Sequence, residues 1–401
     1  MKTYLNIIIT YYIYTNNMSI KKVLITGGLG FIGSHVTVEV LNSGFDVVIV
    51  DNLNNTNITV LDYIKQITKK TNNSNIKFYN VDLTSEYKTN EIFNLEKPQA
   101  VIHMAGLKAV NESIHKPLDY YYNNLVSTMN ILSSMKYFNC DTLIFSSSAT
   151  VYGNQEPPFN EICPIGIGIT NPYGQTKFMI ETMLQDLCKS NPSLKIVSLR
   201  YFNPVGAHQS GLLGEDPNGI PNNLMPLILK TALYNVKNNY KNITNSKLNN
   251  DQLIELSSKL SKIDLDDKYK SFTIFGNNYP TKDGTAERDY IHVVDLAKGH
   301  MKVLQQINNN NYNKFNGYCA YNLGTGNAIS VMDIVTKFKI INKINFEIII
   351  GPKREGDVGI SYANPDKALS DLDWKTEKNL EDMVRDAWFY QLNKYKLIEY
   401  L

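Results

Sequence analysis

The stretch KKVLITGGLGFIGSHVTVEVLNSGFDVVIVDNLNN, residues 21–55, predicts a strand, a glycine turn, a helix and a second strand. Residues 23–26 form a short apolar run that is typical of a buried parallel strand. Apolar residues then recur at helical spacing over 32–41, and Gly44 ends that helix. The run DVVIVD, residues 46–51, is the second strand. Two parallel strands joined by a helix make a right-handed βαβ unit.

The same alternation continues along the chain. Further strands are predicted in NIKFYNVDL, AVIHMAG, TLIFSSSA and KIVSLRYFN, with helical stretches between them. The predicted fold class is therefore α/β, with a doubly wound parallel sheet of the Rossmann type over residues 21–200. After residue 200 the sequence becomes rich in Gly, Pro and Asn. We expect residues 201–398 to form a smaller C-terminal α/β domain that binds the substrate.

Two segments are predicted to stand outside this architecture. Residues 1–20 hold an apolar, tyrosine-rich run that is too short to span a bilayer and has no small-residue cleavage site after it. We expect a disordered extension, with Met18 as the natural start. Residues 237–270 are dominated by Asn, Lys and Ser, and we expect a largely disordered low-complexity insertion. Within it, DQLIELSSKLSKI has the pattern of a short amphipathic helix.

Composition narrows the class of protein. The chain has 401 residues, of which 43% are hydrophobic, which is enough for a substantial core. A formal net charge of +2 does not mark a nucleic-acid or polyanion binder. The four cysteines are scattered, form no C-x-x-C pair and offer no metal framework. This usage predicts a reducing compartment, and we expect the cytoplasm.

The glycine turn carries a dinucleotide-binding pattern. Gly27, Gly30 and Gly33 lie between a strand and a helix, where they permit a tight turn and close approach of a pyrophosphate to the helix N-terminus. Asp51 ends the second strand, and a carboxylate there can accept hydrogen bonds from the adenosine ribose hydroxyls. The segment DNLNNTN contains no arginine that would bind a 2′-phosphate. The pattern therefore favours NAD over NADP.

A second pattern points to proton transfer. Tyr173 and Lys177 are one helical turn apart in NPYGQTK, and Ser148 ends a predicted strand upstream. A lysine ammonium beside a phenol favours the phenolate, which would lower the tyrosine pKa. Such a tyrosine can take a proton from a sugar hydroxyl near neutral pH. Ser148 could hydrogen-bond the same hydroxyl.

The motifs TGGLGFIG, SSSATVYG and NPYGQTK together resemble those of the extended short-chain dehydrogenase/reductase family. Further segments narrow the resemblance to the UDP-glucose 4-epimerases within that family: AGLKAVNES, LRYFNPVGAH, GEDPNGIPNNLMP, DGTAERDYIHVVDLA, YNLGTG and KREGDV. The resemblance implies an NAD-dependent isomerase that interconverts UDP-galactose and UDP-glucose through a transient 4-keto sugar, with NAD tightly bound. It also implies a homodimer.

The resemblance implies roles for the residues at matching positions. Tyr173 would act as the base, assisted by Lys177 and Ser148. The NAD site would be lined by Gly27, Gly30, Phe31, Ile32, Gly33, Asp51, Asn52, Asp82, Leu83, Met104, Ala105, Gly106, Lys108, Asn123, Ser146, Tyr173, Lys177 and Tyr201. The UDP-sugar would be held by Lys108, Ser148, Tyr173, Asn203, Asn223, Leu224, Phe275, Arg288, Arg354, Asp357 and Ser361. The chemistry of the two arginines agrees, because guanidinium groups bind diphosphate oxygens through two donors.

Other functions share this scaffold. A 4,6-dehydratase carries an Asp-Glu pair beside the catalytic serine or threonine, and a decarboxylase carries a Glu there, whereas Ala149 and Thr150 follow Ser148 here. A non-enzymatic NAD sensor on the same fold commonly lacks the tyrosine or the lysine, and this chain has both. Epimerisation is therefore favoured.

One position bears on substrate breadth. In the family, the position held here by Ser361 controls the room around C2 of the sugar, and a tyrosine there narrows the pocket. Serine is small. We therefore expect some activity on UDP-N-acetylglucosamine and UDP-N-acetylgalactosamine as well.

Overall fold

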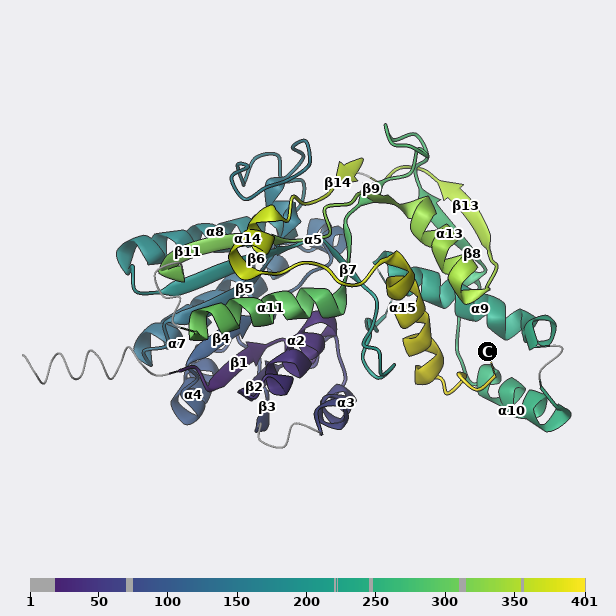
Figure 1. Cartoon of the computed structure of the whole chain (residues 1–401), viewed down its shortest axis with the longest axis horizontal. Helices are drawn as coiled ribbons and strands as arrows, with labels where there is room; N and C mark the ends of the chain where they lie inside the picture. The colour runs from purple at the N-terminus through teal and green to yellow at the C-terminus, as the bar shows by residue number, and fades with distance from the viewer. Residues whose placement is uncertain are drawn as a thin grey trace, which may run out of the picture.

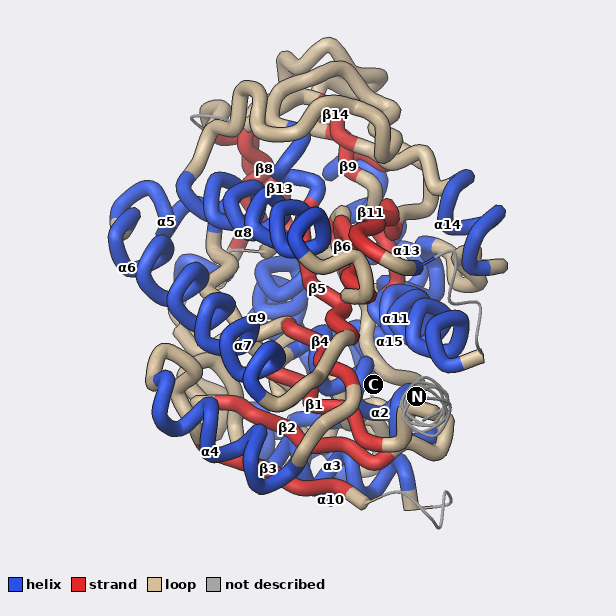
Figure 2. Tube along the Cα trace, turned by 90° about the vertical axis from the view of Figure 1, so that its left-hand side faces the viewer, coloured by secondary structure: helices blue, strands red, loops and turns tan. Residues whose placement is uncertain are grey.

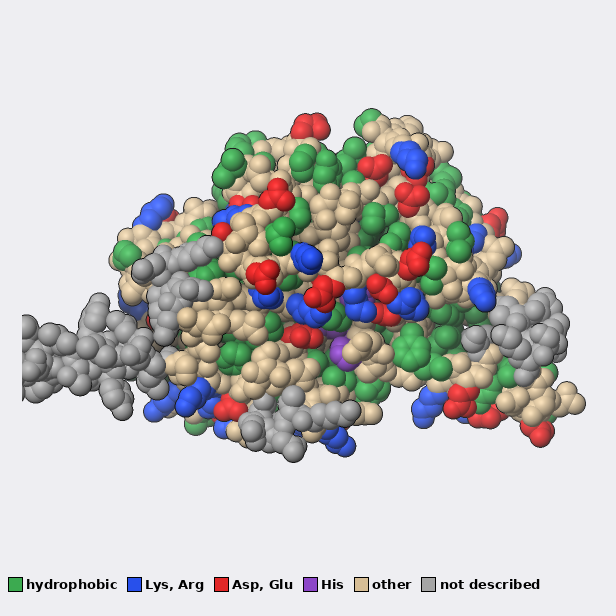
Figure 3. Space-filling model, viewed as in Figure 1, with side chains coloured by type: hydrophobic (Ala, Val, Ile, Leu, Met, Phe, Trp, Pro, Cys, Tyr) green, Lys and Arg blue, Asp and Glu red, His purple; other side chains and the backbone are tan. Residues whose placement is uncertain are grey.

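The computed structural model of the chain describes residues 19–69, 75–219, 221, 223–244, 248–309, 315–354 and 357–400. Two lobes lie side by side in Figure 1: a larger one built on a sheet, and a smaller one that contains α9, α10, α13 and α15. Cationic and anionic side chains are interspersed over the face drawn in Figure 3. Within the described ranges, no helix combines the length and apolar character needed to cross a membrane.

Seven parallel strands form the sheet of the larger lobe, in the order β11-β6-β5-β4-β1-β2-β3. Their bounds are β1 (Lys22–Thr26), β2 (Asp46–Asp51), β3 (Ile76–Asn80), β4 (Ala100–His103), β5 (Thr142–Ser148), β6 (Lys195–Tyr201) and β11 (Gly317–Leu323). The strand order reverses at β1, which pairs with both β2 and β4. Ligands of such sheets bind at this reversal, outside the carboxyl ends of the strands. The predicted doubly wound parallel sheet is confirmed.

Helices cover both faces of the sheet, which explains why its strands are continuously apolar. Val23 and Ile25 share a core with residues of the helices α2 (Phe31–Asn42), α3 (Thr59–Thr68) and α11 (Val293–Asn308). Leu24 shares a second core with residues of α4 (Glu86–Glu96), α7 (Ser127–Tyr137) and α8 (Pro172–Ser190). Figure 2 shows α2 and α11 on one side of the sheet, with α7 and α8 on the other. Successive residues of a strand therefore face opposite helical layers.

The smaller lobe combines short strands with four helices. β8 (Ser271–Phe275) pairs with β13 (Glu347–Gly351), and β9 (Glu287–Arg288) pairs with β12 (Ile329–Ser330) and β14 (Ile360–Ser361). Between the lobes, β7 (Asn203–Val205) pairs with β10 (Tyr290–His292). The helices are α9 (Leu224–Thr244), α10 (Asn250–Ser261), α13 (Val331–Asn342) and α15 (Leu380–Lys394).

The described residues of the two lobes also form shorter helices. The α-helices are α5 (Val110–His115), α6 (Pro117–Tyr121) and α14 (Asp366–Leu372), the π-helix is η1 (Tyr122–Val126), and the 3-10 helices are η2 (Ala149–Tyr152) and η3 (Asp267–Tyr269).

The prediction of a largely disordered insertion at 237–270 is wrong for most of that segment. Helix α9 extends to Thr244, and α10 follows from Asn250, with a capping box at Asn249. Leu256 and Leu260 lie one turn apart on α10, and both are buried in the core of the smaller lobe. The polar composition hid these few apolar positions, which suffice to dock the predicted amphipathic helix. Residues 245–247 lie outside the described residues.

The predicted boundary at residue 200 does not divide the chain in space. Strand β11 returns to the edge of the large sheet beside β6, and α11 packs against α2. The polypeptide therefore enters the smaller lobe and comes back, and each lobe is built from separate stretches of chain. The alternating pattern of the first 200 residues cannot reveal this return, because β11 joins the sheet from a distant part of the sequence.

Most of the predicted N-terminal extension, residues 1–18, lies outside the described residues. Its last position does not fit the prediction of disorder. The backbone N–H of Ile20 donates to Asn308 Oδ1 at 2.6 Å, and the Ile20 side chain is buried in the core beneath β1. The ordered fold therefore begins before residue 21.

Candidate functional site

A cleft of about 710 Å³ opens at the carboxyl ends of β1, β2 and β4. All eighteen residues predicted to line an NAD site lie on its walls: Gly27, Gly30, Phe31, Ile32, Gly33, Asp51, Asn52, Asp82, Leu83, Met104, Ala105, Gly106, Lys108, Asn123, Ser146, Tyr173, Lys177 and Tyr201. Most of them follow or end a strand near the reversal of strand order, whereas Asn123 comes from η1, and Tyr173 and Lys177 come from α8. The cleft therefore joins the glycine turn and the Tyr-Lys pair in one space.

Two glycines of the turn, Gly27 and Gly33, leave no room for a side chain at their positions. Gly27 has φ +65°, and a Cβ on it would lie 2.9 Å from the backbone nitrogen of Ala105. A Cβ on Gly33 would lie 2.0 Å from the carbonyl oxygen of Gly27. Helix α2 begins after Gly30, and no side chain caps its first N–H groups. The uncapped N–H groups and the bare backbone fit a pyrophosphate, which suits a dinucleotide such as NAD.

Asp51 stands at the end of β2, on the wall of the cleft. Its carboxylate accepts backbone N–H groups from Leu29 at 3.1 Å and from Leu53 at 2.9 Å. Burial raises the pKa of Asp51, and these two N–H donors act in the opposite direction. The carboxylate oxygens keep lone pairs for further hydrogen-bond donors in the cleft.

The far wall of the cleft comes from the smaller lobe and was missed by the sequence analysis. Asn218 bridges the lobes, since its backbone N–H donates to Asn55 Oδ1 at 3.1 Å and its side chain donates to the Asn54 carbonyl at 3.0 Å. Lys394 of α15 bonds both oxygens of Asp216 at 2.7 Å. Further lining residues of this wall are Glu215, Pro217, Tyr390, Asn393 and Lys396. No local pattern marks these residues, because their partners are far away in the sequence.

Tyr173 and Lys177 project from the first turns of α8, which Asn171 caps and Pro172 opens. The ammonium of Lys177 donates to the carbonyl of Ser146 at 2.6 Å and lies 5.8 Å from the centre of the Tyr173 ring. The Ser148 hydroxyl shares a hydrogen bond with Tyr173. The predicted triad is therefore assembled where β5 meets α8.

The pKa of Tyr173 departs from the sequence-based expectation. Burial raises it, and the hydrogen bond with Ser148 opposes the rise only in part. Burial also lowers the pKa of Lys177 to about 8. For the protein alone the pKa of Tyr173 is thus raised, because loss of solvent outweighs the hydrogen bond with Ser148. The expected lowering relies on the ammonium together with the positive nicotinamide ring of bound NAD⁺. A further positive charge in the cleft would favour the phenolate.

Most of the residues predicted to hold a UDP-sugar form a second group outside the lining of this cleft, whereas Lys108 and Tyr173 are on its walls. Arg288 bonds Asp357 at 3.2 Å, and Ser361 of β14 pairs in register with Arg288 of β9. The guanidinium of Arg354 lies 4.2 Å from the centre of the Phe275 ring. The side chains of this group thus bring two cations and an aromatic face together in the smaller lobe.

Four more predicted residues link the group to the cleft. Lys108 lies on the cleft wall and bonds Glu215 at 3.3 Å, and Asn223 donates to the same carboxylate. Leu224 follows as the first residue of α9. Asn203 opens β7, just after β6 ends at Tyr201. These positions span the junction between the lobes.

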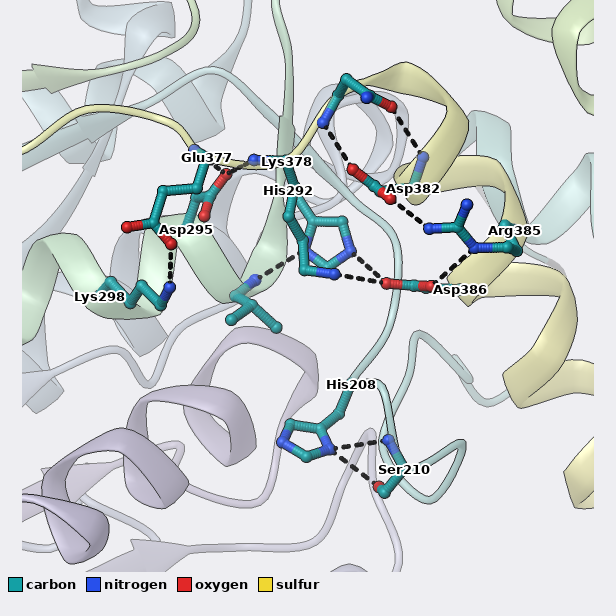
Figure 4. Close-up of polar contacts among 12 residues, drawn as sticks. His208, Ser210, His292, Asp295, Lys298, Glu377, Lys378, Asp382, Arg385 and Asp386 are labelled. Atoms are coloured by element: carbon teal, nitrogen blue, oxygen red, sulfur yellow. Dashed lines mark hydrogen bonds and ion pairs between the residues drawn. The ribbon is translucent and has the colours of Figure 1, made fainter.

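A polar cluster fixes one lobe against the other (Figure 4). His292 Nε2 bonds Asp386 of α15 at 3.2 Å, and the ammonium of Lys378 bonds the same oxygen at 2.9 Å. Asp295 of α11 accepts the backbone N–H groups of Glu377 and Lys378. Because α11 packs on the large sheet and α15 belongs to the smaller lobe, this cluster ties the two lobes together.

Comparison with known proteins gives consistent matches over nearly the whole chain. The model of the NAD dependent epimerase/dehydratase family matches residues 23–324, and that of GDP-mannose 4,6 dehydratase matches residues 274–387. The chain is 42% identical over 381 residues to a UDP-glucose 4-epimerase of Bacillus subtilis, covering 94% of this chain and 99% of that protein. It is 43% identical over 371 residues to a UDP-glucose 4-epimerase of Dictyostelium discoideum, covering 92% and 95%.

A solved structure shares the fold as well. The UDP-glucose 4-epimerase from Bifidobacterium longum in complex with NAD⁺ and UDP superposes with a TM-score of 0.80 at 41% sequence identity, covering 94% of this chain and 100% of that chain. Family model, full-length relatives and structure therefore agree. This chain belongs to the NAD-dependent epimerase/dehydratase family and, within it, to the UDP-glucose 4-epimerases.

Proposed function

We propose that this chain interconverts UDP-glucose and UDP-galactose by inverting C4 of the hexose, as an NAD-dependent isomerase. The observation that carries the proposal is the meeting of Tyr173 and Lys177 with the bare glycine turn in one cleft. When bound, NAD supplies the acceptor and donor of the hydride at C4. Incubating the purified protein with UDP-galactose, without added NAD, and separating the two UDP-sugars by anion exchange tests the proposal directly.

The cofactor is assigned to the residues of the cleft. The pyrophosphate binds at the uncapped start of α2, beside Gly27, Gly30 and Gly33. The Asp51 carboxylate accepts hydrogen bonds from the ribose hydroxyls. Asn54, Asn55 and Asn218 close the cleft from both lobes, which supports tight retention of the dinucleotide. Denaturing the purified protein and assaying the supernatant for NAD⁺ or NADH measures this retention.

The chain's own residues perform the proton transfer. Tyr173 as the phenolate takes the proton from O4 of the hexose, and Ser148 hydrogen-bonds the same hydroxyl. Lys177 stabilises the phenolate by its charge. Loss of hydride from C4 leaves a transient 4-keto sugar. Return of the hydride to the opposite face of C4, and of the proton from Tyr173 to O4, then inverts the centre.

The UDP group must stay bound while the sugar presents its second face. We assign this anchoring to Arg288 and Arg354, with further contacts from Lys108, Asn203, Asn223, Leu224, Phe275 and Asp357. The two guanidinium groups suit the diphosphate, and the Phe275 ring already stacks with one of them. Few contacts to the hexose itself are needed, because both of its faces must fit the same site.

Two alternatives are less well supported. A 4,6-dehydratase requires an acid and a base beside Ser148, where the chain has Ala149 and Thr150 in the turn η2. A non-enzymatic NAD sensor would have no need for a buried Lys177 bonded to the strand end beside Tyr173. Appearance of a 4-keto-6-deoxy product, or complete absence of turnover with NAD bound, would favour the first or the second alternative.

We further propose that Ser361 leaves room for an acetamido group at C2. Its strand β14 lies next to Arg288, and its side chain is small. We expect the unmodified protein to turn over UDP-N-acetylglucosamine, and Ser361→Tyr to reduce that rate about a hundredfold by filling the space. Turnover of UDP-galactose should be retained. Steady-state rates with the two sugars measure both effects.

The matched control is Ser361→Ala, which keeps the pocket open and should convert both sugars. If the unmodified protein fails to turn over either N-acetylated sugar, the assignment of Ser361 is wrong. If Ser361→Tyr slows both sugars equally, the substitution disturbs the strand and does not reveal a pocket.

We also propose that the protein is a cytoplasmic homodimer. The compartment is supported by the four free cysteines. The dimer is supported by an exposed apolar stripe on consecutive helices: Leu118 on α6, Tyr122 on η1 and Met129 on α7. Leu118 and Tyr122 are four positions apart, on adjacent helical turns, and Met129 lies seven positions further along the same run of helices.

Replacing Leu118 with Glu should place a charge in this stripe and convert the dimer to a monomer. Sedimentation velocity over a range of protein concentrations measures the change. Leu95→Glu on α4 is the matched control, because Leu95 is also exposed but lies away from the stripe. An unmodified chain that sediments as a monomer at all concentrations would contradict the dimer proposal.

A further inference from the structure

Three consecutive serines at the end of β5 each bond a different turn of α8. Ser148 bonds Tyr173, the Ser146 carbonyl accepts from Lys177 at 2.6 Å, and Ser147 donates to Glu181. The three partners are four residues apart, so they follow one face of the helix. The third contact has no part in the mechanism above, because Glu181 is fully buried and does not line the cleft.

Glu181 is held by a dense set of donors. Arg200 of β6 binds its carboxylate through two nitrogens, at 3.1 and 2.7 Å, and the Tyr318 hydroxyl of β11 donates at 2.9 Å. Arg200 in turn donates to the Tyr152 hydroxyl at 2.8 Å. The side chains of Arg200 and Glu181 are 4% and 0% exposed. A buried ion pair of this kind adds little to the free energy of unfolding over apolar residues of the same volume. Stability alone therefore does not explain why Glu181 and Arg200 are buried here.

Lys177 is the charge that needs this partner. It is buried, its Nζ lies 4.7 Å from the centre of the Phe145 ring, and Glu181 lies one helical turn beyond it. Burial lowers the pKa of Lys177 to about 8, and the Glu181 charge opposes that fall. On β4, His103 also faces the ammonium, but burial lowers its pKa to about 3, so it is neutral when Lys177 titrates. Tyr173 and Tyr201 also line the cleft, and burial raises the pKa of Tyr201, so its phenol stays neutral when Lys177 titrates.

We propose that Glu181 is a positioning residue for the reaction: held by Arg200, Tyr318 and Ser147, its buried carboxylate keeps Lys177 charged beside Tyr173. The inference rests on the proposed function, since it acts through the tyrosine base. It explains why an ion pair without access to ligand lies one turn behind the Tyr-Lys pair. The carboxylate does not touch substrate or cofactor.

The test compares Glu181→Gln with Glu181→Asp. Glutamine keeps most of the volume but removes the charge and leaves the Arg200 cation, and both changes favour neutral Lys177. We expect the alkaline limb of the kcat profile to move to lower pH, and the rate at pH 8 to fall about fivefold, because loss of a nearby opposite charge shifts a pKa by about one or more. Aspartate keeps the charge, so its alkaline limb should stay close to that of the unmodified protein, although its melting temperature also falls.

A second readout does not depend on turnover. Ultraviolet difference titration against the Tyr173→Phe version of each protein reports ionisation of this one tyrosine, which should need higher pH in Glu181→Gln than in Glu181→Asp. If Glu181→Gln does not fold, the double variant Glu181→Gln/Arg200→Met removes both buried charges, and we expect the same direction of both shifts.

Equal pH profiles for the glutamine and aspartate variants would overturn the proposal and leave Glu181 a purely structural residue. That result differs from failure of the proposed function, in which the unmodified protein itself would not interconvert UDP-glucose and UDP-galactose. A shift seen in the glutamine variant alone supports the role of the carboxylate charge.

Discussion

Replacing Tyr173 with Phe is expected to slow the interconversion of UDP-glucose and UDP-galactose by about 10²- to 10⁴-fold, the range attributed to general acid–base catalysis. Phenylalanine preserves the ring and its packing, but no group remains to take the O4 proton. The change removes one hydrogen bond, to Ser148, so the fold and the bound dinucleotide should be retained. A coupled assay for UDP-glucose at saturating UDP-galactose measures the rate.

Tyr79→Phe provides the matched control. Tyr79 lies on β3, and its hydroxyl donates a hydrogen bond to Glu96 at 2.6 Å. The substitution therefore also removes a hydrogen-bonded hydroxyl, but at a position that does not line the cleft. Its rate should be nearly unchanged. Undiminished turnover in Tyr173→Phe, with NAD bound in both variants, would remove the tyrosine from the role of base.

The second large effect is expected at the glycine turn. Gly33→Ala would place a Cβ 2.0 Å from the Gly27 carbonyl oxygen, a contact that neither backbone segment can relieve without moving the turn. We expect the purified variant to carry less than about a tenth of the NAD found in the unmodified protein, with a matching loss of activity, because the pyrophosphate cradle is displaced. Cofactor released on denaturation gives the measurement.

Gly44→Ala is the control from the other end of the same helix. A Cβ on Gly44 meets nothing within 4 Å, but its φ of +87° makes alanine strained there. This substitution should lower stability by about 1 kcal/mol without changing the bound NAD. If the two variants lose cofactor equally, the loss reflects general destabilisation and not the cradle.

Much of the larger lobe could be predicted from residues 21–55 and the strands that follow. Parallel strands covered on both faces are apolar throughout, so β1 and β2 are recognisable as short continuous runs. Gly27 and Gly33 mark the turn because no other residue fits their contacts. These patterns involve residues that are close together in the sequence, so a single sequence is enough to recognise them.

The errors concern interactions between distant segments. Leu256 and Leu260 are two apolar residues in a polar stretch, and only the core they meet shows that α10 is ordered. The return of β11 to the sheet, and Lys394 on the cleft wall, depend on contacts across the fold. Composition cannot reveal such contacts, because each partner is unremarkable by itself.

The candidate site likewise combines features that local sequence patterns predict with features that depend on the folded structure. The spacing of Tyr173 and Lys177 predicted their meeting, since it is fixed by one helical turn. The raised pKa of Tyr173 in the protein alone could not be predicted, because burial of the phenol is a property of the folded protein and not of the spacing. The burial of Glu181, on the same helix, could not be predicted, because glutamate side chains usually face solvent.

The polypeptide passes between the lobes repeatedly: after β6, before α11, after β11, and on both sides of α14, which packs on β11. The lobes are therefore joined by several backbone connections and not by a single linker. For the same reason, no single cut in the chain would yield either half as an intact fragment.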